Sequence, residues 1–137
     1  MKADRDFTLM RAVIAAGLAA SVALLAAICL LPQLIMGRIA DTVSPALISA
    51  KEKAHSDKPS DALEDVVYIR ETVENSCSEL MMLFSHGELF ELLRAVRAAE
   101  EIAPTDDPAQ LLQELTSIET EIELLYGLNT ISLENLF

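Results

Sequence analysis

The chain of 137 residues carries 22 acidic and 10 basic side chains, a formal net charge of −12, and 52% of its residues are hydrophobic. The acids concentrate in the second part, where 18 acids oppose 4 bases from Asp57 onward and nine acids follow Arg97 without a base. Because such a surface repels phosphate groups, we expect no binding to nucleic acids. A basic partner and a merely solubilising surface both fit this charge.

An uncharged stretch of 26 residues separates Arg11 from Arg38. A helix rises about 1.5 Å per residue, so this stretch is long enough to cross a hydrocarbon core of about 30 Å. It exceeds the apolar core of a cleaved signal peptide, usually about 7 to 15 residues, and Ile28 before Cys29 does not fit a lipoprotein signal. We therefore predict an N-terminal tail over residues 1–11 and an uncleaved transmembrane helix over residues 12–36.

The orientation of this helix is not decided by the number of flanking cations, because three stand near each end: Lys2, Arg5 and Arg11 before it, and Arg38, Lys51 and Lys53 after it. The short distance of the first three from the helix start, together with the charged amino terminus, favours a cytoplasmic tail. We therefore expect a bacterial inner-membrane protein whose C-terminal domain lies in the periplasm.

Small residues recur at every fourth position of the predicted transmembrane helix. This spacing lets a second helix approach closely, although alanine-rich anchors also occur without a partner. The candidate helix-packing residues are Ala12, Ala16 and Ala20 in one row, and Ala15, Ala19, Ala23 and Ala27 in another.

Helical signals continue beyond the apolar stretch. Ser44 followed by Pro45 is typical of an N-cap and the first helical position, which predicts a short juxtamembrane helix to about His55. The turn residues that follow, Ser56 to Ser60, predict a connector. Residues 37–60 are thus interpreted as a juxtamembrane helix and a linker.

Residues 61–137 contain three amphipathic segments and are predicted to form a small antiparallel helical bundle, so the fold class is all-α. The first segment opens with the capping-box pattern Asp61 and Glu64. Arg70 falls on its apolar stripe and either pairs with a carboxylate such as Glu74 one turn on or extends its guanidinium to the edge of the stripe. The stripe consists of Leu63, Val66, Val67, Val73, Cys77, Leu80, Met81 and Phe84.

Two further helices have clear start signals. Ser85 with Glu88 forms a second capping-box pattern, and this helix ends before Pro104. Asp107 before Pro108 opens the last helix, for which Gly127 is the expected left-handed stop. Their apolar positions are Leu89, Phe90, Leu92, Leu93, Val96, Ala99 and Ile102, then Leu111, Leu115, Ile118, Ile122 and Leu125. About two heptads favour packing within the chain over an independent coiled coil.

The sequence carries no recognisable catalytic or cofactor pattern. His55 and His86 lack the context of an activated nucleophile, and the four glycines do not build a phosphate-binding loop. Glu52 and His55 have the spacing found in carboxylate-bridged metal bundles, but a second Glu-x-x-His is missing. We expect no enzyme, no cofactor and no metal site.

The C-terminal end combines acids with apolar residues and has two interpretations. Leu133, Leu136 and Phe137 either cover the bundle or bind a protein partner that the preceding acids attract. The chain as a whole is predicted to be a non-catalytic interaction or assembly subunit of a membrane complex, with a protein partner or a second copy of itself. The alternative is a membrane-anchored helical domain that senses a small-molecule ligand between its helices and signals through a partner.

Overall fold

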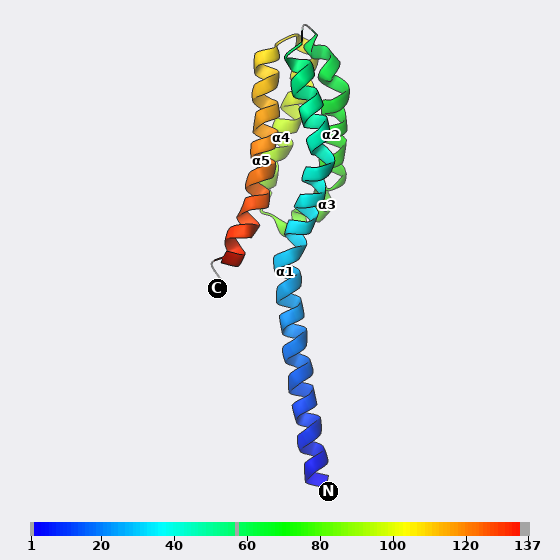
Figure 1. Cartoon of the computed structure of the whole chain (residues 1–137), viewed down its shortest axis with the longest axis vertical. Coiled ribbons are helices and arrows are strands. Elements are labelled where there is room, and N and C mark those ends of the chain that lie inside the picture. The colour runs from blue at the N-terminus through cyan, green and yellow to red at the C-terminus, as the bar shows by residue number, and fades with distance from the viewer. Residues whose placement is uncertain (1, 57, 135–137) are drawn as a thin grey trace. The chain divides into compact units, whose positions relative to one another are not determined.

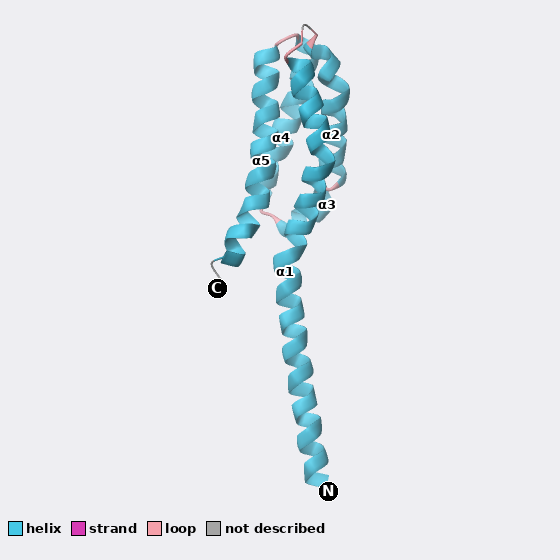
Figure 2. Cartoon of the chain, viewed as in Figure 1, coloured by secondary structure: helices cyan, strands magenta, loops and turns pink. Residues whose placement is uncertain are grey.

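The computed structural model describes the backbone of residues 2–56 and 58–134, and the side chains of residues 7–56 and 58–127. In this part of the chain all regular structure is helical (Figure 2), as the sequence predicted. In chain order the elements are α1 (Lys2–Ala54), η1 (Pro59–Ala62), α2 (Leu63–Asn75), α3 (Cys77–Leu83), α4 (His86–Ile102), η2 (Ala103–Thr105) and α5 (Pro108–Glu134).

The chain divides into two compact units, Met1–Leu31 and Pro32–Phe137. The first unit is part of α1, and its side chains are exposed from Phe7 through Ile28. Among the described helices α1 is long and apolar enough to cross a membrane, and its most apolar window is not buried at all.

The second unit is a helical bundle, in which α1, α2, α4 and α5 lie side by side (Figure 1). Its core is apolar throughout, and no polar or charged residue among those described is buried. From α5 the core takes all five positions that the sequence predicted. These are Leu111, Leu115, Ile118, Ile122 and Leu125.

The predicted helix start at Ser44 is wrong, because α1 continues through Pro32 and Pro45 to Ala54. A proline removes one backbone hydrogen bond, a cost of about 3 kcal/mol. Burial of the α1 side chains on both sides of Pro45 offsets this cost. These buried residues follow helical spacing and belong to the common core: Met36, Ile39, Val43, Leu47, Ala50 and Ala54.

The first predicted bundle helix differs from the structure at both its start and its middle. Pro59–Ala62 form a 3₁₀ turn, and α2 begins after Ala62 without a side-chain cap, so the predicted Asp61–Glu64 box is wrong. The helix is also divided at Ser76, whose N–H is shared between the carbonyls of Thr72 and Val73. A shared bond of this kind is common where a helix ends.

The sequence predicts three signals at the later helix boundaries: the Ser85–Glu88 box, the Asp107 cap and the Gly127 stop. The first two are confirmed. The Ser85 N–H donates to Glu88 Oε2 at 3.0 Å, and the Glu88 N–H donates to Ser85 Oγ at 3.4 Å. The Gln110 N–H donates to Asp107 Oδ1 at 3.1 Å. Gly127 does not end α5, which continues to Glu134, because a helical glycine costs only about 1 kcal/mol relative to alanine.

Candidate interaction site

The predicted helix-packing alanines lie in the first unit, within α1. All seven, from Ala12 to Ala27, are exposed. The polar Ser21 among them is satisfied inside the helix, since its Oγ donates to the Gly17 carbonyl at 2.9 Å. Near the start of the apolar stretch, the Arg11 guanidinium lies 4.4 Å from the ring centre of Phe7. Pairing of this helix with another stays a prediction.

The predicted partner-binding residues at the C-terminal end lie outside the described part of the chain. Leu136 and Phe137 follow the last described residue, and of Leu133 only the helical backbone is described. Their role stays a prediction.

The described side chains that could bind a metal ion or act as nucleophiles do not lie together in a cluster. Within the described residues no group of three or more His, Cys, Asp or Glu side chains is placed to hold a metal ion. Both cysteines are free thiols, and Cys77 packs against the apolar core. His55 and His86 are exposed, and the Nδ1 of His55 lies 2.7 Å from the Lys51 carbonyl.

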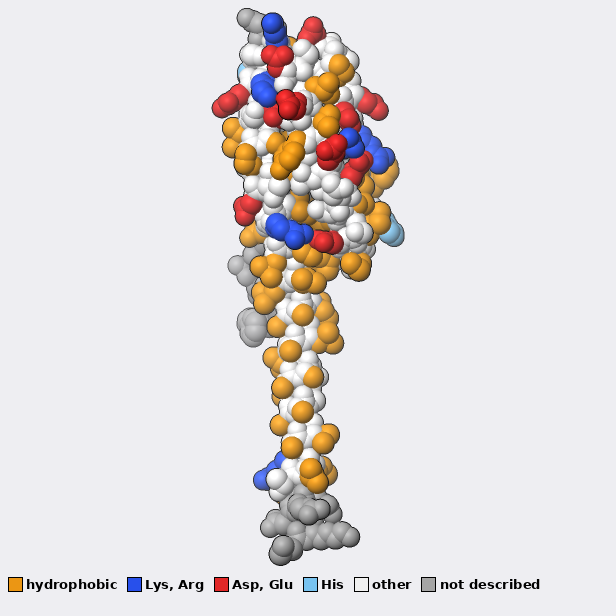
Figure 3. All heavy atoms as spheres, turned by 90° about the vertical axis from the view of Figure 1, so that its right-hand side faces the viewer, with side chains coloured by type: hydrophobic (Ala, Val, Ile, Leu, Met, Phe, Trp, Pro, Cys, Tyr) orange, Lys and Arg blue, Asp and Glu red, His pale blue; other side chains and the backbone are white. Residues whose placement is uncertain are grey.

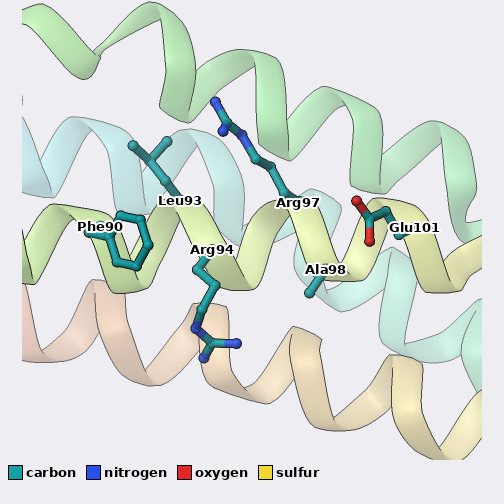
Figure 4. Close-up of a pocket in the computed structure, with 6 residues that line it drawn as sticks. All are labelled: Phe90, Leu93, Arg94, Arg97, Ala98 and Glu101. Atoms are coloured by element: carbon teal, nitrogen blue, oxygen red, sulfur yellow. The ribbon is translucent and has the colours of Figure 1, made fainter.

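A more distinctive feature is the outward face of α4, here called the α4 ridge (Figure 4). It begins with Phe90, which is 62% exposed although the sequence placed it on the buried face. That expectation is wrong, because the adjacent Leu89 and Leu92 take the core positions. The ridge borders a shallow hollow of about 310 Å³ and consists of Phe90, Leu93, Arg94, Arg97, Ala98 and Glu101.

The two arginines of the ridge extend to opposite sides (Figure 4). Arg97 reaches toward α2, where its Nη2 lies 3.2 Å from Glu74 Oε1. Arg94 Nε donates to Glu91 Oε2 at 2.9 Å. The pKa of Arg94 is raised by Glu91 first, and further by Glu114 and Glu121 of α5. The charges beside the hollow are therefore already oriented by neighbouring carboxylates.

An ion-pair cluster joins the ridge to α2. Arg70 Nη1 donates to Glu74 Oε2 at 2.7 Å, as the sequence predicted. Arg70 Nε lies 2.7 Å from Glu100 Oε2 of α4, but the two atoms are not aligned for a hydrogen bond, so we treat this contact as an ion pair. Arg70 and then Arg97 hold the pKa of Glu74 below its ordinary value. The cluster fixes the spacing of α2 and α4 beside the hollow.

The α4 ridge was not recognised in the sequence. The available signal was the pair Arg94 and Arg97, because these are two of only four bases after Asp57 and their spacing puts them on one helix face. The exposure of Phe90, one turn before Arg94, depends on the exact rotation of α4, which spacing alone does not give.

Comparisons with protein-family models, with curated proteins and with solved structures found no match.

Proposed function

We propose that this protein is a single-pass membrane protein whose acidic helical domain binds a protein partner, as a non-catalytic interaction or assembly subunit of a membrane complex. In this proposal α1 crosses a bacterial inner membrane, with the N-terminal tail in the cytoplasm and the domain in the periplasm. The apolar, exposed segment of α1 from Phe7 to Ile28 supports the membrane location.

The observation that carries the interaction function is the α4 ridge. An aromatic side chain that is 62% exposed and is followed on the same helix face by two arginines has the composition of an interface rather than of a solvated surface. Aromatic residues and arginine are enriched at protein interfaces and supply most of the residues that dominate binding energy. The hollow beside Phe90 accepts an apolar side chain of the partner, and its rim carries charges of both signs, which match a polar rim on the partner.

The test uses the full chain in mild detergent, with a photo-crosslinking benzophenone side chain at position 90. Tyr68 of α2 is the matched control, since it is a second aromatic residue that is about half exposed. We expect a defined crosslinked protein at position 90 and none at position 68. In protein without the benzophenone, the substitution Phe90→Ala should reduce recovery of that partner about tenfold or more, which is the usual effect of truncating an interface anchor.

The competing outcomes are distinguishable. A crosslink to a second copy of the chain would make the partner a homo-oligomer and keep the α4 ridge as the interface. Equal recovery by Phe90→Ala and by Tyr68→Ala, with helicity unchanged in both variants, would contradict the proposal.

A further inference from the structure

Two polar contacts establish how α1 aligns with α2 and α3 within the bundle. Ser49 Oγ donates to Asp65 Oδ2 at 2.7 Å, and Arg38 Nη2 donates to Glu79 Oε2 at 2.8 Å. The later α1 residue, Ser49, therefore faces the start of α2, and the earlier α1 residue, Arg38, faces α3 farther along the chain. The helices are antiparallel, and the C-terminal end of α3 lies at the end of the bundle that contains Pro32.

This end of the bundle exposes large apolar side chains. One turn beyond the Arg38–Glu79 pair, α1 carries Leu34 and α3 carries Met82, which are 69% and 79% exposed. Figure 3 shows hydrophobic side chains gathered at this end on the face it displays, whereas charged and hydrophobic side chains are mixed over the rest of the bundle. Water solvates these apolar side chains poorly, so their grouping at one end indicates a covering surface.

The last helix contributes to the same end. A Cβ atom added to Gly37 would lie 3.7 Å from Tyr126 Cε2, so Tyr126 of α5 stands beside Gly37 of α1. Tyr126 is 47% exposed. Figure 1 shows that α5 runs opposite to α1 in the bundle, and α5 continues beyond Tyr126 to Glu134. The ten residues between Glu123 and Glu134 include no charge. We call Leu34, Met82 and Tyr126 the basal surface.

The length of the apolar stretch places the basal surface relative to a bilayer. The 26 uncharged residues from Ala12 to Gly37 extend about 39 Å as a helix, whereas a hydrocarbon core of about 30 Å takes about 20 residues. Counted from Ala12, such a core takes residues up to about 31, which is shorter than the predicted span of 12–36 and leaves residues 32–37 at the level of the headgroups. A tilted helix would bring them deeper.

We infer that the basal surface lies in the interfacial layer of the phospholipid bilayer that α1 spans, so that the domain rests on the membrane. This inference depends on the proposed membrane span. Tyrosine is favoured at membrane interfaces because its ring is apolar and its hydroxyl stays hydrated. Arg38, one turn from Leu34, can extend its guanidinium toward water. The contact is apolar, since an acidic domain is not attracted by anionic headgroups.

The experiment places a fluorescent NBD probe on single cysteines of the full chain, in a background with Cys29→Ala and Cys77→Ala. The positions are Met82→Cys in the basal surface, Ser60→Cys as an exposed control in η1, and Val22→Cys in the apolar segment. Each protein is reconstituted into phosphatidylcholine vesicles that contain nitroxide-labelled lipid, with the nitroxide either near the headgroup or near the end of the acyl chain. Circular dichroism verifies equal helicity.

We expect the headgroup-level nitroxide to quench the Met82→Cys probe, the acyl-end nitroxide to quench the Val22→Cys probe, and the Ser60→Cys probe to retain its fluorescence with both lipids. Quenching at position 22 with no difference between positions 82 and 60 would overturn the inference and leave the membrane span intact. Absence of quenching at position 22 would overturn the span itself, and with it the basal contact, whatever is seen at position 82.

Discussion

Arg70 and Glu74 stand one turn apart on α2 and share a hydrogen bond of 2.7 Å, while Arg97 of α4 approaches the other carboxylate oxygen of Glu74 at 3.2 Å. The Glu74 carboxylate thus contacts guanidinium groups from two helices, Arg70 of α2 and Arg97 of α4. Its pKa is lowered from its ordinary value of 4.5, by Arg70 first and by Arg97 next. A lowered pKa in the folded state means that the ionised carboxylate favours folding.

The first prediction follows from the sign of this shift. Because the folded pKa is below the unfolded one, the stabilisation is present above about pH 4.5 and is lost as the pH falls through the folded pKa. We expect Glu74→Gln to lower the melting temperature of the full chain in detergent at neutral pH. The difference from the unmodified protein should shrink as the pH falls below about 4.5.

The control for this prediction is Glu52→Gln, which makes the same chemical change on the exposed face of α1. It removes one negative charge from an acidic protein without touching the cluster of α2 and α4. A constant effect of Glu74→Gln from neutral to acid pH would show that the ionised carboxylate of Glu74 is not the source of the stabilisation.

A second prediction concerns the start of α5. Asp107→Ala should destabilise the domain by about 1 kcal/mol, because the Gln110 N–H loses its acceptor at 3.1 Å. Gln110→Ala is the control, since the donor is its backbone N–H and survives the change. Thermal denaturation monitored by circular dichroism measures both variants, and an equal effect of the two would argue against the cap.

The third prediction tests the packing of α5. Ile118 is 0% exposed in the apolar core, so Ile118→Asp should cost several kcal/mol by placing an unpaired charge there. Gln113→Asp introduces the same charge at an exposed position of the same helix and should have little effect. If both variants melted alike, α5 would not be packed through Ile118.

Membrane topology is the subject of the fourth prediction. With Cys29 and Cys77 replaced by alanine, the exposed Ser60→Cys should react with a membrane-impermeant maleimide in cells whose outer membrane has been permeabilised and whose inner membrane is intact. Reaction only after the inner membrane is opened would place the domain in the cytoplasm and reverse the proposed orientation. A cysteine at Thr8, before the apolar stretch, should show the opposite pattern.

The sequence predicted those features of the fold that depend on neighbouring residues. The Ser85–Glu88 box and the Asp107 cap involve groups three residues apart, so their geometry follows from the local chain. The start expected at Ser44 is also a local pattern, yet it was wrong. There the buried side chains of α1 on either side, Val43 and Leu47, keep the helix intact.

The candidate interaction site depends on contacts that local patterns do not contain. Leu89 and Phe90 are adjacent and both apolar, so spacing did not decide which of them faces the core. The packing of α4 between α2 and α5 buries Leu89 and leaves Phe90 exposed. Ile69 of α2 is buried but was absent from the predicted stripe, although it lies three residues after Val66 and four before Val73, the same spacing that defines the stripe.

The unbroken course of α1 into the bundle also constrains how the protein folds during synthesis. The ribosome makes the core-facing side chains from Met36 to Ala54 long before Leu125, which completes the same core. Until α5 has emerged, this stripe of α1 has no full cover, and contacts so distant in sequence form slowly. A fragment that starts at Asp57 would lack six core side chains, whereas one that begins upstream of Met36 keeps the whole core.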